Sequence, residues 1–150
     1  EMLVAEIPRS GSRRQQANFD QATFFAFFGA SRTAQRRAYF FHLRDDGTLG
    51  FQEVRPAVAV ISVNYRFELD AGSGLDYPDN GRPIGVFAKV AVRTFVYMLL
   101  MPGSAGYQEM DALLDRSAAV QAGRVRRVVV QAAEVRASWP GAPFWQRLTV

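Results

Sequence analysis

The cleanest alternation of apolar and polar residues in the chain lies within residues 58–69. The apolar residues take every second position: Ile61, Val63, Tyr65, Phe67 and Leu69. The polar residues fall between them: Ser62, Asn64, Arg66 and Glu68. A period of two with one polar face is typical of a half-buried antiparallel strand. We therefore predict a strand over residues 58–69.

A β-hairpin is predicted just before this strand. Residues 35–44 and 48–55 flank the sequence Asp45-Asp46-Gly47, and an Asp-Gly step tolerates the positive φ that tight hairpin turns require. Alternation in the first arm separates two faces. One face carries Tyr39, Phe41 and Leu43, and the other carries Phe40, His42 and Arg44.

A long apolar stretch covers residues 86–101 and follows a loop over residues 70–83 that contains several Gly and Pro residues. Strands usually span about 5–6 residues. Residues 86–101 exceed this length, so we predict one long strand that bends, crosses two sheets or projects from the domain.

The clearest helix is predicted over residues 107–121. Met110, Leu113, Leu114 and Ser117 recur at helical spacing, and Gly123 is suited to end the helix. We predict strands on either side of a turn near Trp139, over residues 124–137 and 145–150. Residues 18–28 allow two interpretations, because Asn18 and Gln21 resemble a helix capping box whereas four phenylalanines favour a buried strand. We favour the strand.

The first residues are rich in Arg, Ser and Gly and lack apolar periodicity, apart from an apolar start at residues 2–5 that suits a short strand. We divide the chain into an extended basic N-terminal arm over residues 1–16 and a single β-rich domain over residues 17–150. The predicted fold is an antiparallel β-sandwich or barrel with one flanking helix at residues 107–121.

Composition narrows the function classes. The chain has 150 residues, which suits one domain. It has no cysteine, which excludes disulfides, thiolate nucleophiles and cysteine-type metal sites. No stretch of about 18 apolar residues predicts a membrane span, and acids stand where a signal peptide needs basic residues. We expect a cytoplasmic protein, or part of a virion assembled in the host cytoplasm.

Little in the sequence points to catalysis or to a cofactor. His42 is the only histidine, so a hydrolase would depend on His42 with Asp45 or Asp46. Asp70, Asp76, Asp79 and Asn80 resemble a weak calcium site, although their spacing does not fit an EF-hand.

We also searched the sequence for a nuclease motif and for a phosphate-binding loop. The sequence Pro78-Asp79 followed by Phe87-Ala88-Lys89 approaches a nuclease motif, but Phe87 replaces the second metal-binding acid. No phosphate-binding glycine loop is present. We expect no enzyme activity and no cofactor.

Arginine provides the strongest functional signal. Residues 1–44 carry a net charge of +4, whereas residues 45–150 carry eleven basic and eleven acidic groups. Six of the seven arginines in residues 1–44 form the candidate binding group: Arg9, Arg13, Arg14, Arg32, Arg36 and Arg37. They allow three interpretations: a solvated surface, docking on an acidic protein, or nucleic-acid binding with stacking by Tyr39, Phe40 or Phe41. We interpret Arg126 and Arg127 as a solvated strand edge.

The basic arm, the mid-chain loop, the long strands and the single helix together resemble virion structural proteins of tailed bacteriophages, such as tail-tube, tail-terminator and capsid-decoration subunits. This resemblance implies a non-enzymatic subunit that assembles with itself in rings or lattices and with neighbouring structural proteins. The segments expected to contact partners are the arm and the loop over residues 70–83. The predicted partner-binding residues are Arg9, Arg13, Arg14, Arg32, Arg36, Arg37, Asp76, Tyr77 and Asp79. A nucleic-acid-binding β-domain is the first alternative, and a hydrolase centred on His42 is the second.

Overall fold

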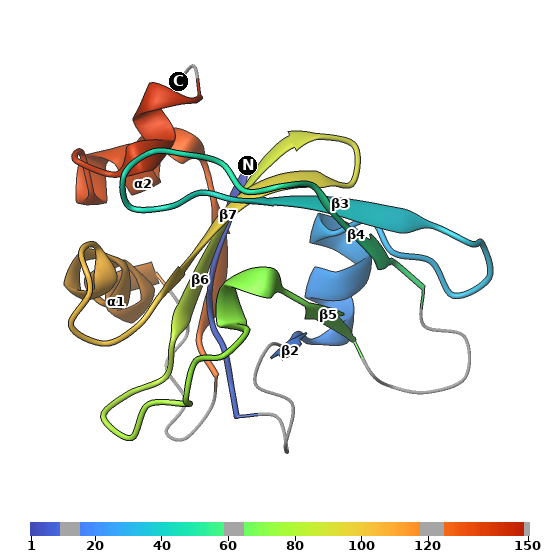
Figure 1. The fold of residues 1–150 in the computed structure, drawn as a ribbon, viewed down its shortest axis with the longest axis horizontal. Helices are drawn as coiled ribbons and strands as arrows, with labels where there is room; N and C mark the ends of the chain where they lie inside the picture. Colours follow the sequence, from blue (N-terminus) through green and yellow to red (C-terminus); the bar gives the residue numbers. More distant parts are fainter. Residues whose placement is uncertain (10–15, 59–64, 118–124, 149–150) are drawn as a thin grey trace.

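The protein is mainly β, with a six-stranded sheet flanked by helices (Figure 1). The computed structural model describes residues 1–9, 16–58, 65–117 and 125–148. The large sheet has the order β4-β3-β7-β6-β1-β8, and a small sheet pairs β2 with β5. The strands are β1 (Met2–Glu6), β2 (Gln16–Asn18), β3 (Arg37–His42), β4 (Glu53–Pro56), β5 (Arg66–Glu68), β6 (Ile84–Ala91), β7 (Thr94–Leu100) and β8 (Arg127–Val130).

The helical elements lie between and after these strands. They are the π-helix η1 (Thr23–Phe27), the 3-10 helix η2 (Asp70–Gly72), the α-helices α1 (Tyr107–Ser117) and α2 (Ala132–Ser138), and the 3-10 helix η3 (Pro143–Gln146). The prediction of a mainly β fold with a flanking helix is confirmed. The sheet is mixed rather than antiparallel, because β3 pairs with β7 in parallel.

Each face of the large sheet has its own hydrophobic core. One core is largely aromatic and is closed by η1 and the small sheet, with Phe28, Phe40 and Phe95 fully buried. The other core is mostly aliphatic and is closed by α1, α2 and η3. Burying each large apolar side chain contributes about 1.5–3 kcal/mol, so these two cores supply much of the stability.

The long apolar stretch forms a hairpin and not one strand. Strands β6 and β7 pair antiparallel, with Val86 opposite Met98, and the chain reverses at Val92 and Arg93. Arg93 has a φ of 49°, a left-handed conformation in which Gly or Asn is more usual. The prediction of a single strand was therefore wrong, because the turn lacks the residues that normally mark one.

The start of the chain belongs to the sheet. Strand β1 lies between β6 and β8 and is completely buried. The predicted arm over residues 1–16 is therefore wrong for Met2–Glu6, since these apolar residues complete the protein's own sheet. Arg13 and Arg14 lie outside the described residues.

The loop over residues 70–83 is anchored on the same domain. The Tyr77 hydroxyl donates to the Ile7 carbonyl at 2.8 Å, and the Asp70 N–H donates to Glu53 Oε1 at 2.8 Å. The Tyr97 hydroxyl donates to Glu53 Oε2 at 2.8 Å, and burial raises the pKa of Glu53. Contrary to expectation, part of this loop therefore packs against the domain without a neighbouring subunit.

Other predictions had mixed outcomes. The hairpin is confirmed, with Tyr39 opposite Val54 and Gly47 at a φ of 85°. Helix α1 is confirmed to Ser117, and β5 confirms the end of the predicted strand over residues 58–69. Residues 59–64 and 118–124 lie outside the described part of the chain.

Two strand predictions were wrong, and a third was right only for its first part. Residues 23–27 form η1, and residues 143–146 form η3. Most of residues 124–137 divides between β8 and α2. Tertiary packing accounts for the first difference, because η1 turns Phe24 and Phe27 into the aromatic core. None of the helices in the described residues is sufficiently long and apolar to cross a membrane.

Candidate functional site

Four arginines meet where β3 begins and the β6–β7 hairpin turns. Arg32, Arg36 and Arg37 come from the segment leading into β3, and Arg93 comes from the hairpin turn. Arg36 Nη1 donates to the Gly29 carbonyl at 3.0 Å, and Arg93 Nε donates to the Arg37 carbonyl at 3.3 Å. The second of these bonds holds the two segments together, and the first closes the segment leading into β3 on itself. We call Arg32, Arg36, Arg37 and Arg93 the arginine cluster.

The arginine cluster is not neutralised by the described part of the protein. No carboxylate in residues 1–9, 16–58, 65–117 or 125–148 lies within 4.0 Å of any of the four guanidinium groups. Arg32, Arg36 and Arg37 are exposed, and Arg93 is half-exposed. The guanidinium of Arg32 lies 4.8 Å from the centroid of the Phe25 ring, a cation–π contact that leaves its charge uncancelled. The cluster is therefore a concentrated source of positive potential.

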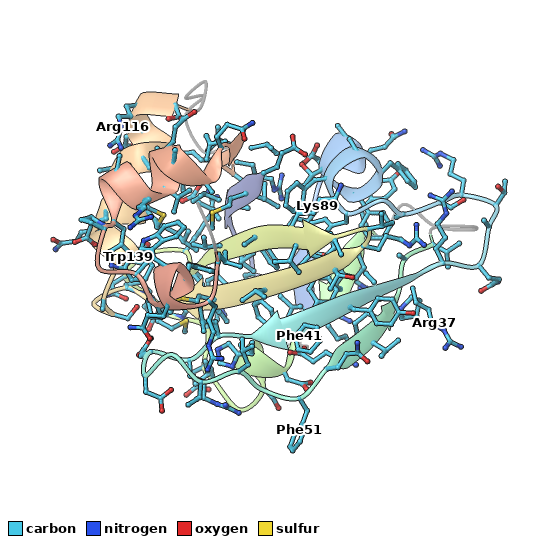
Figure 2. The ribbon with its side chains drawn as sticks, turned by 90° about the horizontal axis from the view of Figure 1, so that it is seen from above. Arg37, Phe41, Phe51, Lys89, Arg116 and Trp139 are labelled. Carbon is cyan, nitrogen blue, oxygen red and sulfur yellow. The ribbon has the colours of Figure 1, made fainter. Side chains whose placement is uncertain are left out.

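An uncovered part of the large sheet adjoins the arginine cluster. On the aliphatic side of the sheet, helices α1, α2 and η3 lie toward one end, and no helix of the described residues covers β3 and β7 at the other end (Figure 2). Tyr39, Phe41 and Thr94 are partly exposed there, and Val54 is 40% exposed. Register places Tyr39 between Val54 and Thr94. We call Tyr39, Phe41, Val54 and Thr94 the open face.

A further cation lies toward the helical end of the open face. Arg147 follows η3, and its Nε donates to the Gly47 carbonyl at 2.9 Å, beyond the opposite end of β3 from Arg37. Lys89 is half-exposed on β6 opposite Phe95, so the register places it on the aromatic side of the sheet, close to the β6–β7 turn. Both line a cavity of about 330 Å³ between the sheet and the C-terminal helices, together with Glu1, Met2, Ala88, Val90, Ala132 and Leu148. Positive charge thus lies at both ends of the open face.

The predicted partner-binding residues divide between two places. Arg32, Arg36 and Arg37 belong to the arginine cluster. Arg9 lies elsewhere, with its guanidinium 4.6 Å from the Tyr77 ring centroid and 3.9 Å from Asp79. Asp76 is in the same loop as Tyr77 and Asp79. Figure 1 shows this loop, in lime green, on the opposite side of the molecule from the segment leading into β3.

His42 packs beside an aromatic ring of the core. Its ring centroid is 5.4 Å from that of Tyr97 on the aromatic side of the sheet. Burial, and then the nearby Arg44 charge, lowers the pKa of His42, so that the imidazole is mainly neutral at pH 7. The Asp46 carboxylate accepts hydrogen bonds from the Thr48 N–H at 2.9 Å and from the Thr48 hydroxyl at 2.6 Å. Asp46 therefore stabilises the hairpin turn.

The proposed cation-binding loop does not gather ligands in the described structure. Within residues 1–9, 16–58, 65–117 and 125–148, no three Asp, Glu or His side chains are grouped so that they would hold a metal ion. Asp70, one of the four predicted ligands, pairs with Arg55 at 2.8 Å. The carboxylate thus contributes to a local ion pair.

A second group of charges is internally paired. Arg126 Nη2 contacts Glu6 at 3.0 Å and Asp111 at 2.5 Å, and its Nη1 contacts Asp115 at 2.5 Å. The hydrogen bond from Arg126 to Glu6 raises the pKa of Arg126. We call Glu6, Arg126, Asp111 and Asp115 the ion-pair network. The prediction of a solvated edge was wrong for Arg126, because this side chain connects β1 to α1.

Sequence reasoning missed two basic residues of the site. Arg93 and Arg147 are distant from the N-terminal arginines along the chain and join the site only through the fold. The unusual abundance of arginine was the available signal, but it did not distinguish the arginine cluster from the ion-pair network.

Comparison with known proteins identifies a shared fold. No protein-family model and no curated protein matches the chain. Among solved structures, the chain is similar to the N-terminal domain of Helicobacter pylori LlaJI.R1, with a TM-score of 0.56 and 10% sequence identity. The similarity covers 87% of this chain and 98% of that one. At this identity the resemblance establishes the fold alone.

Proposed function

We propose that this protein is a nucleic-acid-binding β-domain. The observation that carries the proposal is an exposed arginine cluster without carboxylate partners in the described residues, beside an uncovered sheet face that presents Tyr39 and Phe41. Guanidinium groups bind phosphates with two parallel hydrogen bonds, and an exposed aromatic ring offers a surface for bases or sugars. The two types of group therefore complement the two parts of a nucleotide.

The placement of the charges supports this proposal. The net charge of the whole chain is only +4, but the charge is unevenly distributed. The arginine cluster lies at one end of the open face, and Arg147 lies toward the other. A nucleic-acid backbone has phosphates at regular intervals, so contacts at both ends would position it across the face. Each neutralised phosphate would also release counterions and favour binding at low salt.

The experiment measures binding of a short, fluorescently labelled, random-sequence DNA duplex, and of one of its strands, over a salt series. Arg32→Ala/Arg36→Ala/Arg37→Ala should weaken binding on the order of 100-fold at low salt, and should reduce the slope of log affinity against log salt by about 2–3. The matched control is Arg66→Ala/Arg116→Ala/Arg136→Ala, which removes the same charge from exposed positions elsewhere.

The control variant should retain most of the affinity and nearly the same salt slope. An equal loss in both variants would mean that net charge, and not the arginine cluster, determines binding. No binding of either probe by the wild-type protein at low salt would refute the proposal.

A second proposal is an assembly subunit of a larger homo-oligomer, as the resemblance to virion proteins implies. One observation favours it: β4 is an edge strand of the large sheet, and Leu49, Phe51 and Val54 expose apolar surface along that edge. Edge strands can pair with another chain. Light scattering over a concentration series tests the proposal, because a protein that stays monomeric throughout would argue against it.

A further inference from the structure

Phe51 is the most exposed large apolar side chain in the described structure, with 96% of its surface accessible. It projects from the β4 edge of the sheet into solvent (Figure 2). The other aromatic side chains in the described ranges are buried or partly buried. Phe51 therefore contributes almost nothing to the hydrophobic cores.

The backbone around Phe51 is fixed on both sides. The Gly50 N–H donates to the His42 carbonyl at 2.8 Å, and Glu53 pairs with Phe40 in the β3–β4 ladder. Between these points the chain presents Phe51 on a short, supported segment. A phenylalanine has only two side-chain torsions, so immobilising its ring on binding costs little conformational entropy.

Cations lie on either side of Phe51 along the same edge. The Arg44 guanidinium lies beside Gly50, where a Cβ added to this glycine would be 3.5 Å from Arg44 Nη2. Arg37 begins β3 opposite Pro56, at the other end of β4. A single apolar ring between phosphate-binding groups is the arrangement by which proteins place a wedge against stacked bases.

We infer that Phe51 contacts the bases of a bound nucleic acid, with its ring stacked on a base or inserted between two bases. The inference rests on the proposed function and assigns Phe51 a role that differs from that of the arginine cluster. Arginines would bind the backbone and produce the salt dependence, whereas Phe51 would add affinity without releasing counterions. These two contributions can be separated by experiment.

The first measurement compares the affinity of Phe51→Ala with that of the wild type for the same duplex and single strand. We expect a loss of about 10-fold or more for at least one probe, with the salt slope unchanged. Phe51→Trp should restore the affinity because it retains an aromatic ring. Leu75→Ala is the control, since Leu75 is 42% exposed in the distant loop and should have no effect on binding.

The second measurement uses 2-aminopurine, a base whose fluorescence rises when it is unstacked, in place of adenine in both probes. Saturating wild-type protein should change this fluorescence, and Phe51→Ala should not. The Arg32→Ala/Arg36→Ala/Arg37→Ala variant should still change it once enough protein is added, because its Phe51 is intact.

The outcomes distinguish this inference from the proposed function. Wild-type binding with the same affinity and the same 2-aminopurine signal in Phe51→Ala would overturn the role of Phe51 and leave the arginine cluster in place. Absence of wild-type binding would overturn both. Light scattering should give equal masses for the wild type and Phe51→Ala. Self-association that disappears in Phe51→Ala, with DNA binding unchanged, would assign this ring to a protein interface and would also overturn the inference.

Discussion

Two charged sites in this protein place the same arginine side chain in opposite surroundings. In the ion-pair network, Arg126 contacts three carboxylates and its side chain is only 15% exposed. In the arginine cluster, no carboxylate of the described residues lies within ion-pair distance of the guanidinium groups. The first group uses its charges within the fold, and the second leaves them available. An arginine therefore indicates a binding surface only where the fold provides no acid to neutralise it.

The largest expected effect on stability is at Arg126. Arg126→Ala should lower the free energy of unfolding by about 3 kcal/mol, because the buried Glu6 carboxylate would lose its closest cation while Asp111 and Asp115 would lose their shared partner. Urea denaturation at pH 7 measures the change. Arg116→Ala on the exposed side of α1 is the control and should change stability by about 0.5 kcal/mol or less. Equal effects of the two substitutions would contradict the structural role of Arg126.

The ion-pair network should also make stability depend on pH. Burial alone would raise the pKa of Glu6, but hydrogen bonds and charge from Arg126 outweigh burial and hold this pKa below its usual value of 4.5. A carboxyl with a lowered folded-state pKa stabilises the protein above its unfolded-state pKa, and this contribution is lost as pH falls through the folded-state value.

The corresponding variant is Glu6→Gln, which keeps the shape of the side chain and removes its charge. We expect it to be about 1–2 kcal/mol less stable than the wild type at pH 7, with a difference that shrinks toward pH 3. Urea denaturation across this pH range provides the measurement. A difference that grows as the pH falls would have the wrong sign for an ionised, paired Glu6.

The fold was predicted best where the signal was local. The alternating positions near Phe67 and the Asp46-Gly47 step each determine structure within a few residues, and both predictions were confirmed. The β6–β7 turn was missed because Arg93 adopts a left-handed conformation without a glycine. The burial of Met2–Glu6 was also missed, since it depends on pairing with β6 and β8 more than 70 residues away.

The candidate site, like the fold, was predicted only where its residues are close together along the chain. Arg32, Arg36 and Arg37 were identified from their density along the chain, and they do lie together at the start of β3. Arg93 joins them only because the β6–β7 hairpin returns beside Gly29. The exposure of Phe51 was also missed, because residues 48–55 were predicted as one hairpin arm, whereas β4 begins only at Glu53 and leaves Phe51 before it. Pairing between distant segments determines which charges and rings remain accessible.

The smallest expected effect on stability is at Arg93, and it separates the two groups most directly. Arg93→Gly removes one charge of the arginine cluster and relieves a left-handed backbone that costs a non-glycine residue about 1 kcal/mol. The glycine also makes the unfolded chain more flexible by a comparable amount, so these two terms nearly cancel and the lost hydrogen bond from Arg93 Nε to the Arg37 carbonyl remains as the net cost. We expect the free energy of unfolding to fall by about 1 kcal/mol or less, while DNA affinity falls and the salt slope decreases by about 1. Urea denaturation and fluorescence anisotropy on the same preparation measure both quantities. A large loss of stability with unchanged binding would place Arg93 with Arg126, among the arginines that hold the fold together.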